Sequence, residues 1–315
     1  MKTAFLFPGQ GAQTVGMAAD IAASCADAAR IFERANDILG YDLRGICFNG
    51  PDEKLNTTTI SQPAIFTVSA AILEVLRSSN ATAAIKPDIT AGLSLGEYTA
   101  LYAAGLLSFK DTLNLVQERG NAMQAAAEAS DGSMVSIIGL DEEKVNKLCR
   151  QAGQGDLLVP ANFNCPGQIV ITGTSKACQR AEQLAEKHGA MKAVVLKVAG
   201  AFHSEMMAPA AKTLRAALDN CQIADITATK VIANITADYY SAPDRIRDGL
   251  TRQLTEPILW QKCMEKLLAD GVEKFYEIGP GRVLTGLMKR INRKTRVTNI
   301  SSLKSLQDAR AVVSV

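Results

Sequence analysis

The sequence predicts an α/β protein with a parallel sheet, because one local pattern occurs three times along the chain. In each case a short apolar run meets a glycine-rich turn and is followed by residues with helical spacing. Strand, turn and helix in alternation favour a parallel sheet, since each helix carries the chain back to the edge where the next strand starts. The strands begin at Thr3, Ile89 and Phe275, and the helices are expected over residues 15–39, 97–107 and 283–291.

The pattern changes between residues 131 and 199, where the expected order is strand, helix, strand, strand, helix, strand. The strands are expected at 134–138, 157–162, 169–172 and 193–198, and the helices at 142–152 and 176–188. This βαββαβ order is the split βαβ arrangement of ferredoxin-like domains. We therefore expect a small domain at 131–199, inserted into a larger α/β domain that is formed by 1–130 and 200–315.

Composition narrows the class of protein. With 315 residues, 47% of them apolar, the chain can bury a large core, and a net charge of +2 gives no general attraction for nucleic acid or membranes. The seven cysteines include no CxxC pair, and their odd number argues against a complete disulfide framework. The apolar run after Lys2 spans only Ala4 to Phe7, too short for a signal peptide or a membrane span. We expect a cytoplasmic enzyme that binds neither nucleic acid nor membrane.

Residues 92–96 fit the pattern G-x-S-x-G with Ser94 at its centre. In this pattern a serine occupies a tight strand-to-helix turn that only small flanking residues permit, and the strand and helix expected here supply that context. A serine hydroxyl becomes a nucleophile when a base removes its proton and donors stabilise the oxyanion. The backbone N–H of Leu95 is one such donor. The alternative is that Ser94 only caps the helix.

The base must be one of two histidines, His188 and His203. His188 precedes a glycine at the expected end of a helix, where a histidine bonds the last carbonyls, so a structural function is favoured. His203 follows the last strand of the inserted domain, and a loop there can reach Ser94, so we expect it to be the general base. Spacing singles out no acidic third member, since Glu205 and Asp238 are merely available, and a backbone carbonyl could orient the histidine instead.

Arg119 is the candidate anion-binding residue. It lies beside the apolar stripe of its helix rather than opposite it, where an arginine pairs with an anion, although spacing alone favours a surface arginine that snorkels to water. A second basic feature could meet an acidic partner or could be a solvated helix end. It consists of Lys289, Arg290, Arg293, Lys294 and Arg296.

Two other motifs are weaker. The turn at residues 8–14 has Thr14 where G-x-G-x-x-G needs a small residue, and residues 17–18 lack the Lys-Ser/Thr of a phosphate loop. What remains is a row of backbone N–H groups suited to hold an oxyanion. Cys165 is a rival nucleophile, but no histidine neighbours it in any motif. No cluster of histidine and cysteine indicates a metal site.

Seven segments together resemble the malonyl-CoA:acyl-carrier-protein transacylases, in that family's order and over nearly the whole chain. Each motif is moderately specific alone, whereas seven in one order are highly specific. They are FPGQGAQ at 7–13, GLSLGEY at 92–98, QERG at 117–120, NFNCPGQ at 162–168, GAFHS at 200–204, RQL at 252–254 and EIGPG at 277–281. One departure is Leu93, where many members have a histidine that is not the family's base, so only packing at the turn is affected.

The resemblance implies an α/β-hydrolase-like parallel-sheet domain with an inserted ferredoxin-like small domain, in agreement with the pattern above. It implies that Ser94 is the nucleophile and His203 the base and acid. The further assignments that it implies are an oxyanion hole from the N–H groups of Gln10 and Leu95, a ligand for the malonyl carboxylate at Arg119, a main-chain carbonyl at Gln253 that orients the histidine, and a side chain at Phe202 that crowds a C2 methyl group.

The expected function is ping-pong transfer of malonyl from malonyl-CoA to the phosphopantetheine thiol of acyl carrier protein, through an ester on Ser94. We expect a monomer with no bound cofactor or metal, serving fatty acid or polyketide synthesis, with Lys289 and Arg290 as candidate docking residues for the carrier protein. A serine esterase or thioesterase would share Ser94 and His203 but would not need an anion-binding Arg119. A catalytically silent carrier-binding subunit would not need the intact set.

Overall fold

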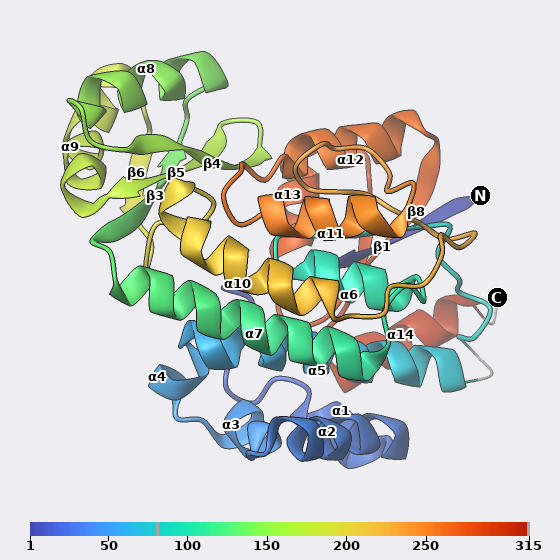
Figure 1. Cartoon of the computed structure of the whole chain (residues 1–315). Coiled ribbons are helices and arrows are strands. Elements are labelled where there is room, and N and C mark those ends of the chain that lie inside the picture. The colour runs from blue at the N-terminus through green and yellow to red at the C-terminus, as the bar shows by residue number, and fades with distance from the viewer. Residues whose placement is uncertain (80–81, 314–315) are drawn as a thin grey trace.

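A computed structural model describes residues 1–79 and 82–313, and these residues form one parallel and one antiparallel sheet (Figure 1). Every pairing in the larger sheet is parallel, as the three strand-turn-helix units predicted. In spatial order its strands are β7 (Lys230–Val231), β2 (Ile89–Gly92), β1 (Lys2–Phe7), β8 (Val272–Ile278) and β9 (Val297–Ile300).

The central strand β1 divides the large domain into two cores. Its side chains alternate, so that Phe5 and Phe7 enter one apolar cluster while Ala4 and Leu6 enter another on the opposite face of the sheet. The first cluster is covered by α2 (Ala26–Leu39), α5 (Thr58–Ser78), α6 (Gly96–Ala103) and α7 (Phe109–Glu128), and the second by α12 (Trp260–Ala269) and α13 (Val283–Ile291). A sheet buried on both faces is the arrangement expected of parallel strands.

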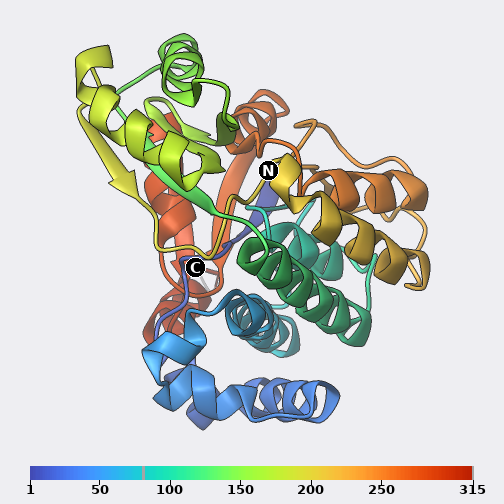
Figure 2. The ribbon, with the colours of Figure 1, turned by 60° about the vertical axis from the view of Figure 1, so that its left-hand side comes forward.

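Several helices have no counterpart among the sequence patterns. Figure 2 shows α5 packed between α2 and α7, with α10 running beside α7. The others complete the large domain around the sheet. The elements without a predicted counterpart are α3 (Leu43–Asn49), α4 (Asp52–Leu55), α5, α10 (Ala208–Asp219), α11 (Pro243–Arg252), α12, α14 (Leu303–Val313), β7 and β9.

The helix α5 is long and apolar enough to cross a membrane by length and composition. However, 83% of its most apolar window is buried inside the protein, which is typical of the core helix of a globular domain. It also carries fully buried polar side chains, among them Gln62, which accepts a hydrogen bond from Arg119 on α7.

The smaller sheet has the ferredoxin-like topology that the βαββαβ pattern predicted. Its strand order, numbered within the unit, is 2-3-1-4, and every pairing is antiparallel. In spatial order the strands are β4 (Leu158–Cys165), β5 (Gln168–Thr174), β3 (Gly132–Ile138) and β6 (Lys192–Val195), covered by α8 (Glu142–Gly153) and α9 (Ser175–Ala185). The domain boundaries at 130/131 and 199/200 stay a prediction.

Two predicted helices of the large domain are wrong in extent. The region 15–39 contains two helices, α1 (Ala19–Ser24) and α2, because Cys25 between them has an extended backbone with φ −131°. The helix expected over 97–107 ends at Ala103, shortly before Gly105 takes a left-handed φ of 78°.

Two elements of the small domain also end earlier than predicted. The helix expected over 176–188 ends at Ala185 and continues as one 3₁₀ turn, after which Gly189 adopts φ 88°. The strand expected over 193–198 ends at Val195. Residues 196–198 instead line the cleft between the two domains.

Candidate active site

Ser94 occupies the tight turn between β2 and α6, with a left-handed φ of 50°. Small residues make the turn feasible, because a Cβ at Gly96 would meet the carbonyl of Phe7 on the neighbouring strand. The Ser94 N–H donates to Asn234 Oδ1 at 2.7 Å. The interpretation of Ser94 as a helix cap is wrong, since Leu95 is the N-cap residue of α6 and the Ser94 hydroxyl makes other contacts.

His203 contacts Ser94 directly: its Nε2 lies 3.0 Å from Ser94 Oγ, and its Nδ1 lies 2.7 Å from the carbonyl oxygen of Gln253. Because a carbonyl oxygen only accepts, Nδ1 carries the proton and Nε2 is free to accept from the serine hydroxyl. Burial, followed by the charge of Arg119, lowers the pKa of His203 to about 3. The imidazole is therefore neutral near pH 7, which is the form that a base requires.

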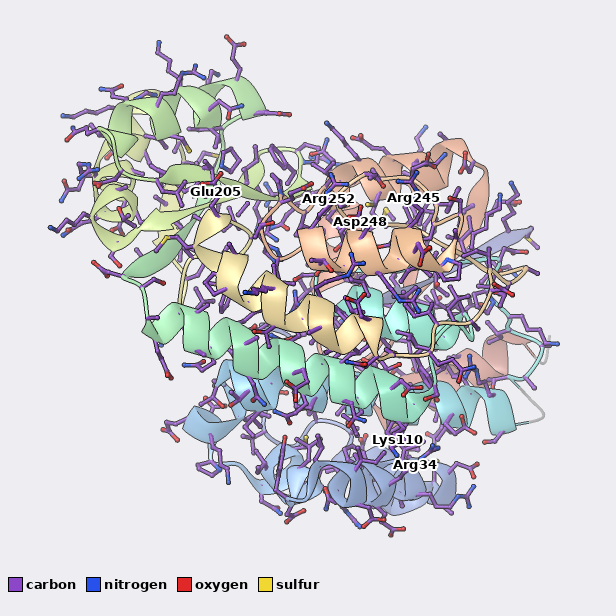
Figure 3. The ribbon with its side chains drawn as sticks, viewed as in Figure 1. Arg34, Lys110, Glu205, Arg245, Asp248 and Arg252 are labelled. Carbon is purple, nitrogen blue, oxygen red and sulfur yellow. The ribbon has the colours of Figure 1, made fainter. Side chains whose placement is uncertain are left out.

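The other titratable candidates lie elsewhere. His188 Nε2 is 2.8 Å from Gln151 Oε1 on the exposed side of the small domain. Glu205 is exposed at the start of a 3₁₀ turn (Figure 3), and Asp238 forms an ion pair with Lys266 at 3.8 Å. The backbone carbonyl of Gln253 thus occupies the place that a third acidic residue would take.

The two neighbouring residues of the RQL segment face opposite ways. Arg252 and Asp248 lie on the outer face of α11 (Figure 3), where Arg252 also pairs with Glu256 at 2.7 Å. Gln253, at the C-cap of α11, is fully buried behind the site. The C-terminal end of α11 therefore places the carbonyl and the side-chain amide of Gln253 in the interior, while the charged side chains of Arg252 and Asp248 lie on the outside.

Arg119 is buried, with 1% of its surface exposed, so the interpretation of a snorkelling surface arginine is wrong. Its Nη1 donates to Gln62 Oε1 at 2.7 Å, and its Nη2 lies 3.0 Å from both Ser94 Oγ and Gln253 Oε1. The guanidinium lies 5.5 Å from the ring centre of Tyr98. Two amide oxygens and a ring hold the cation beside the serine, without a carboxylate as direct partner among the described residues.

The backbone N–H groups of Gln10 and Leu95 indicate a site that can stabilise negative charge. The glycine turn after β1 packs against the serine turn so closely that a Cβ at Gly9 would meet the carbonyl of Leu93. Within the part of the chain that the structure describes, the N–H groups of Gln10 and Leu95 make no hydrogen bond. Unpaired donors on two adjoining turns are the arrangement that an oxyanion hole needs.

These groups open into a cleft of about 510 Å³. Its large-domain wall carries Gln10, Ser94, Arg119, Phe202 and His203, and its other wall consists of Met134 and Asn162 from the small domain with the connecting residues 196–198. Sequence reasoning did not find Met134, Asn162 or the exposed Lys197. Asn162 opens the NFNCPGQ segment and joins the domains through a bridge with Ile258.

A buried polar network behind the site was also missed. The carboxylate of Glu97 lies at its centre and accepts hydrogen bonds from the Asn234 N–H, the Tyr240 hydroxyl and the Gln253 side-chain amide. Glu97 could have been noticed, because it is an acidic residue in an otherwise apolar stretch next to Ser94, but Asn234 and Tyr240 belong to no motif in the sequence.

The remaining candidates do not line the cleft. The Cys165 thiol is buried and contacts Gln168 Oε1 at 3.8 Å, and burial raises its pKa. Lys289 and Arg290 are exposed on α13, where Arg290 donates to Gln168 Oε1 at 2.9 Å and to the carbonyl of Pro166 at 3.3 Å. Among the described residues no group of three or more His, Cys, Asp or Glu is placed to hold a metal ion.

Comparison with known proteins agrees with this site. The family model described as "Acyl transferase domain" matches residues 4–310. The malonyl CoA-acyl carrier protein transacylase of Bacillus subtilis (strain 168) is 43% identical, over 97% of this chain and 95% of that protein. The enzyme of the same name from Escherichia coli (strain K12) is 44% identical, over 91% of this chain and 92% of that protein.

Solved structures give the same result. A malonyl-transacylase in complex with a type II PKS acyl-carrier protein superposes with TM-score 0.95 at 38% identity, covering 99% of this chain and 100% of that one. An acyl carrier protein S-malonyltransferase from Vibrio cholerae O1 biovar eltor has TM-score 0.93 at 42% identity, covering 98% and 99%.

The two-domain fold, with a Ser-His pair and a buried cation in the cleft, defines an acyltransferase. The chain belongs to the acyl transferase domain family and, within it, to the malonyl CoA-acyl carrier protein transacylases.

Proposed function

We propose that this enzyme transfers malonyl from malonyl-CoA to the phosphopantetheine thiol of acyl carrier protein through an ester on Ser94. The observation that carries the proposal is the position of Ser94 Oγ, 3.0 Å from both His203 Nε2 and Arg119 Nη2. His203 can accept the hydroxyl proton, and Arg119 donates to the same oxygen and can stabilise the negative charge that develops on it. Relatives with the transacylase name are 43–44% identical.

In the first half-reaction Ser94 Oγ attacks the malonyl thioester carbonyl and His203 Nε2 takes the hydroxyl proton. The N–H groups of Gln10 and Leu95 stabilise the tetrahedral oxyanion. The carbon–sulfur bond then breaks, and the departing coenzyme A sulfur receives the proton from His203. In the second half-reaction the phosphopantetheine thiol gives its proton to His203 and attacks the ester, which returns the proton to Ser94.

Arg119 is the proposed ligand of the malonyl carboxylate. When malonyl-CoA binds, the guanidinium turns its N–H groups from the Ser94 oxygen to the carboxylate at the far end of the acyl group, and it keeps that partner in the ester. A planar guanidinium and a carboxylate match in a two-pronged ion pair. Phe202 lines the cleft beside His203 and would crowd a methyl group at C2, which favours malonyl over methylmalonyl.

We further propose that the enzyme has two partners, the coenzyme A thioester and acyl carrier protein. Lys289 and the neighbouring Arg290 form part of the docking surface for the carrier protein. The enzyme is proposed to be a cytoplasmic monomer with no bound cofactor, supplying fatty acid or polyketide synthesis.

The test is the intact mass of the protein after mixing with malonyl-CoA, followed by peptide mapping. A single malonyl adduct on Ser94, discharged by a pantetheine thiol, is the expected result. A label on Cys165 would exclude the serine ester. An adduct lost to water at the same rate with and without a thiol acceptor would instead identify an esterase or thioesterase, and no adduct at all would favour a silent binding subunit.

A further inference from the structure

A buried carboxylate, Glu97, lies behind the functional side chains and does not line the cleft. It stands on the first turn of α6 with 1% of its surface exposed. Tyr240 Oη donates to its Oε1 at 2.5 Å, and its Oε2 accepts from Gln253 Nε2 at 2.7 Å and from the Asn234 N–H at 3.2 Å. Three donors thus converge on one carboxylate, and a group that only accepts fits this environment.

Two of the partners of Glu97 bind the functional groups directly. Asn234 Oδ1 accepts from the Ser94 N–H at 2.7 Å, at the turn that presents the nucleophile. Gln253 binds His203 Nδ1 through its main-chain carbonyl at 2.7 Å and Arg119 Nη2 through its side-chain oxygen at 3.0 Å. Through these two residues a single carboxylate is connected to the nucleophile, the base and the cation.

The amide of Gln253 shows how this connection would act. Its oxygen accepts from Arg119, so its nitrogen must face Glu97 Oε2 and the carbonyl of Ser94, which lies 3.1 Å away. Without an acceptor at Glu97, the amide loses one of the bonds that fix its orientation. The main-chain carbonyl of Gln253 also accepts from His203, so a change in the orientation of its side-chain amide would alter the position of the base.

We propose that Glu97 is a positioning residue of the transfer reaction, whose ionised carboxylate fixes Asn234 and Gln253 and so holds Ser94, His203 and Arg119 in register. The inference rests on the proposed function. Protonation of Glu97 would turn one of its oxygens into a donor. The Asn234 N–H and the Gln253 NH2 group cannot accept, and Tyr240 Oη could accept only by giving up its own donation, so one of the three bonds to the carboxylate would be lost. The alignment of the site therefore depends on the charge of a residue that no substrate touches.

The neighbours of Glu97 determine when that charge is present. The titratable or charged groups that act on it are Arg119 on α7, Tyr98 on α6, Tyr240 in the loop before α11, and Cys263 on α12. Burial raises the pKa of Glu97 to about 7, against the lowering effect of its hydrogen bonds and of Arg119. His203, with a pKa of about 3, keeps one protonation state through this range.

The test is Glu97→Gln, which keeps the size of the side chain but removes one acceptor. Acylation of Ser94 by malonyl-CoA is measured in single turnover from pH 5 to 8.5. At pH 8 the maximal rate constant should fall about 10- to 100-fold, the usual effect of a misaligned site, while the half-saturating concentration of malonyl-CoA stays unchanged. The wild-type rate should fall as the pH decreases through about 7, whereas the variant should give a flat profile.

Glu277→Gln is the matched control. Glu277 is a fully buried carboxylate that accepts from the N–H groups of Leu284 and Thr285 at the start of α13 and from the Thr285 hydroxyl, and neither it nor these partners line the cleft. Its replacement should lower the free energy of unfolding and leave the acylation rate and its pH profile as in the wild type. Equal losses in both variants would mean that any buried carboxylate has this effect, and the inference would be overturned.

A second variant decides the question if Glu97→Gln does not fold. Tyr240→Phe removes one oxygen whose hydrogen bond goes to Glu97, and the acylation rate constant should fall about three- to tenfold. Wild-type acylation rates in folded Glu97→Gln and Tyr240→Phe proteins would overturn the inference about Glu97 and leave the proposed function intact. A wild-type protein that forms no malonyl adduct would instead overturn the proposed function.

Discussion

The two walls of the cleft are built in different ways. The large-domain wall places Ser94, Arg119 and His203 on separate elements and joins them by hydrogen bonds to buried residues, mainly Gln253. The small-domain wall contributes Met134 and Asn162, with the connecting residues 196–198, and most of that domain packs around its own apolar core. Under the proposed function, the difference teaches that the chemistry would depend on one hydrogen-bonded polar cluster in the large-domain wall, while the opposite wall would only face the acyl group.

Removal of the nucleophile is the most severe way to test this division. In Ser94→Ala, acylation should fall by about five to six orders of magnitude, because the other groups of the site cannot replace the attacking oxygen. The fold should be unaffected, since alanine at φ 50° is no more strained than serine and the lost volume opens into the cleft. Single-turnover mass spectrometry and thermal melting measure the two effects. A Ser94→Ala protein that still transfers malonyl would move the chemistry to another residue.

Removal of the base compares the two histidines directly. His203→Ala should slow acylation by about two to four orders of magnitude, the usual range for a positioned acid-base group. His188→Ala should leave the rate unchanged, because His188 contacts Gln151 on the small domain and lies outside the cleft. Rapid-quench acylation at saturating malonyl-CoA measures both. The reverse order of effects would place the chemistry on the small-domain side.

Replacement of Arg119 tests the acyl specificity of the large-domain wall. Arg119→Ala leaves the malonyl carboxylate without its partner, and breaking a desolvated charge pair typically costs about 3 to 5 kcal/mol, or about two to four orders of magnitude in specificity. Acetyl-CoA has no second carboxylate and should lose much less. The measurement is the ratio of Ser94 acylation by the two donors. An unchanged malonyl-to-acetyl ratio would reduce Arg119 to a structural residue, and an esterase would again become the better interpretation.

The sequence predicted the parts of the molecule that are set by local patterns. Glycine-rich turns predicted the strand-to-helix units. The order of strands and helices along the chain predicted both sheets, including the antiparallel one with its ferredoxin-like strand order. The position of Ser94 follows from the same local rules, since small residues are needed at its turn. The helix α5 was missed because it is buried on most sides and therefore lacks the amphipathic stripe that periodicity detects.

The polar network could not be predicted in this way, because its bonds join residues far apart in the chain. Ser94 and Asn234 are separated by 140 positions, and Glu97 and Gln253 by 156. Arg119 shows the same difficulty, since spacing favoured a surface position that its burial against Tyr98 and Gln62 overturns. Which face of a helix is truly interior depends on tertiary packing, and only the family resemblance pointed to an anion site there.

The smallest expected effect concerns the contact between the two walls and the carrier protein. Both residues are exposed, but Arg290 donates to Gln168 and to the carbonyls of the adjoining turn and so ties α13 to the small domain, whereas Lys289 makes no such bond to the described residues of that domain. Lys289→Glu should therefore weaken use of the carrier protein about two- to fivefold, the range of an exposed charge pair, with little change for a small pantetheine thiol. The difference should shrink as salt is added, because screening acts on exposed charges.

Arg290→Glu should behave differently, since loss of its bonds to the turn loosens the small-domain wall and should lower use of both acceptors alike. Steady-state rates with the two acceptors at low and high salt separate the cases. If Lys289→Glu also affected both acceptors equally, or if its effect ignored salt, α13 would not be an electrostatic docking surface. The carrier protein would then have to approach the cleft over another part of its rim, where Lys197 is the exposed cation that lines the opening.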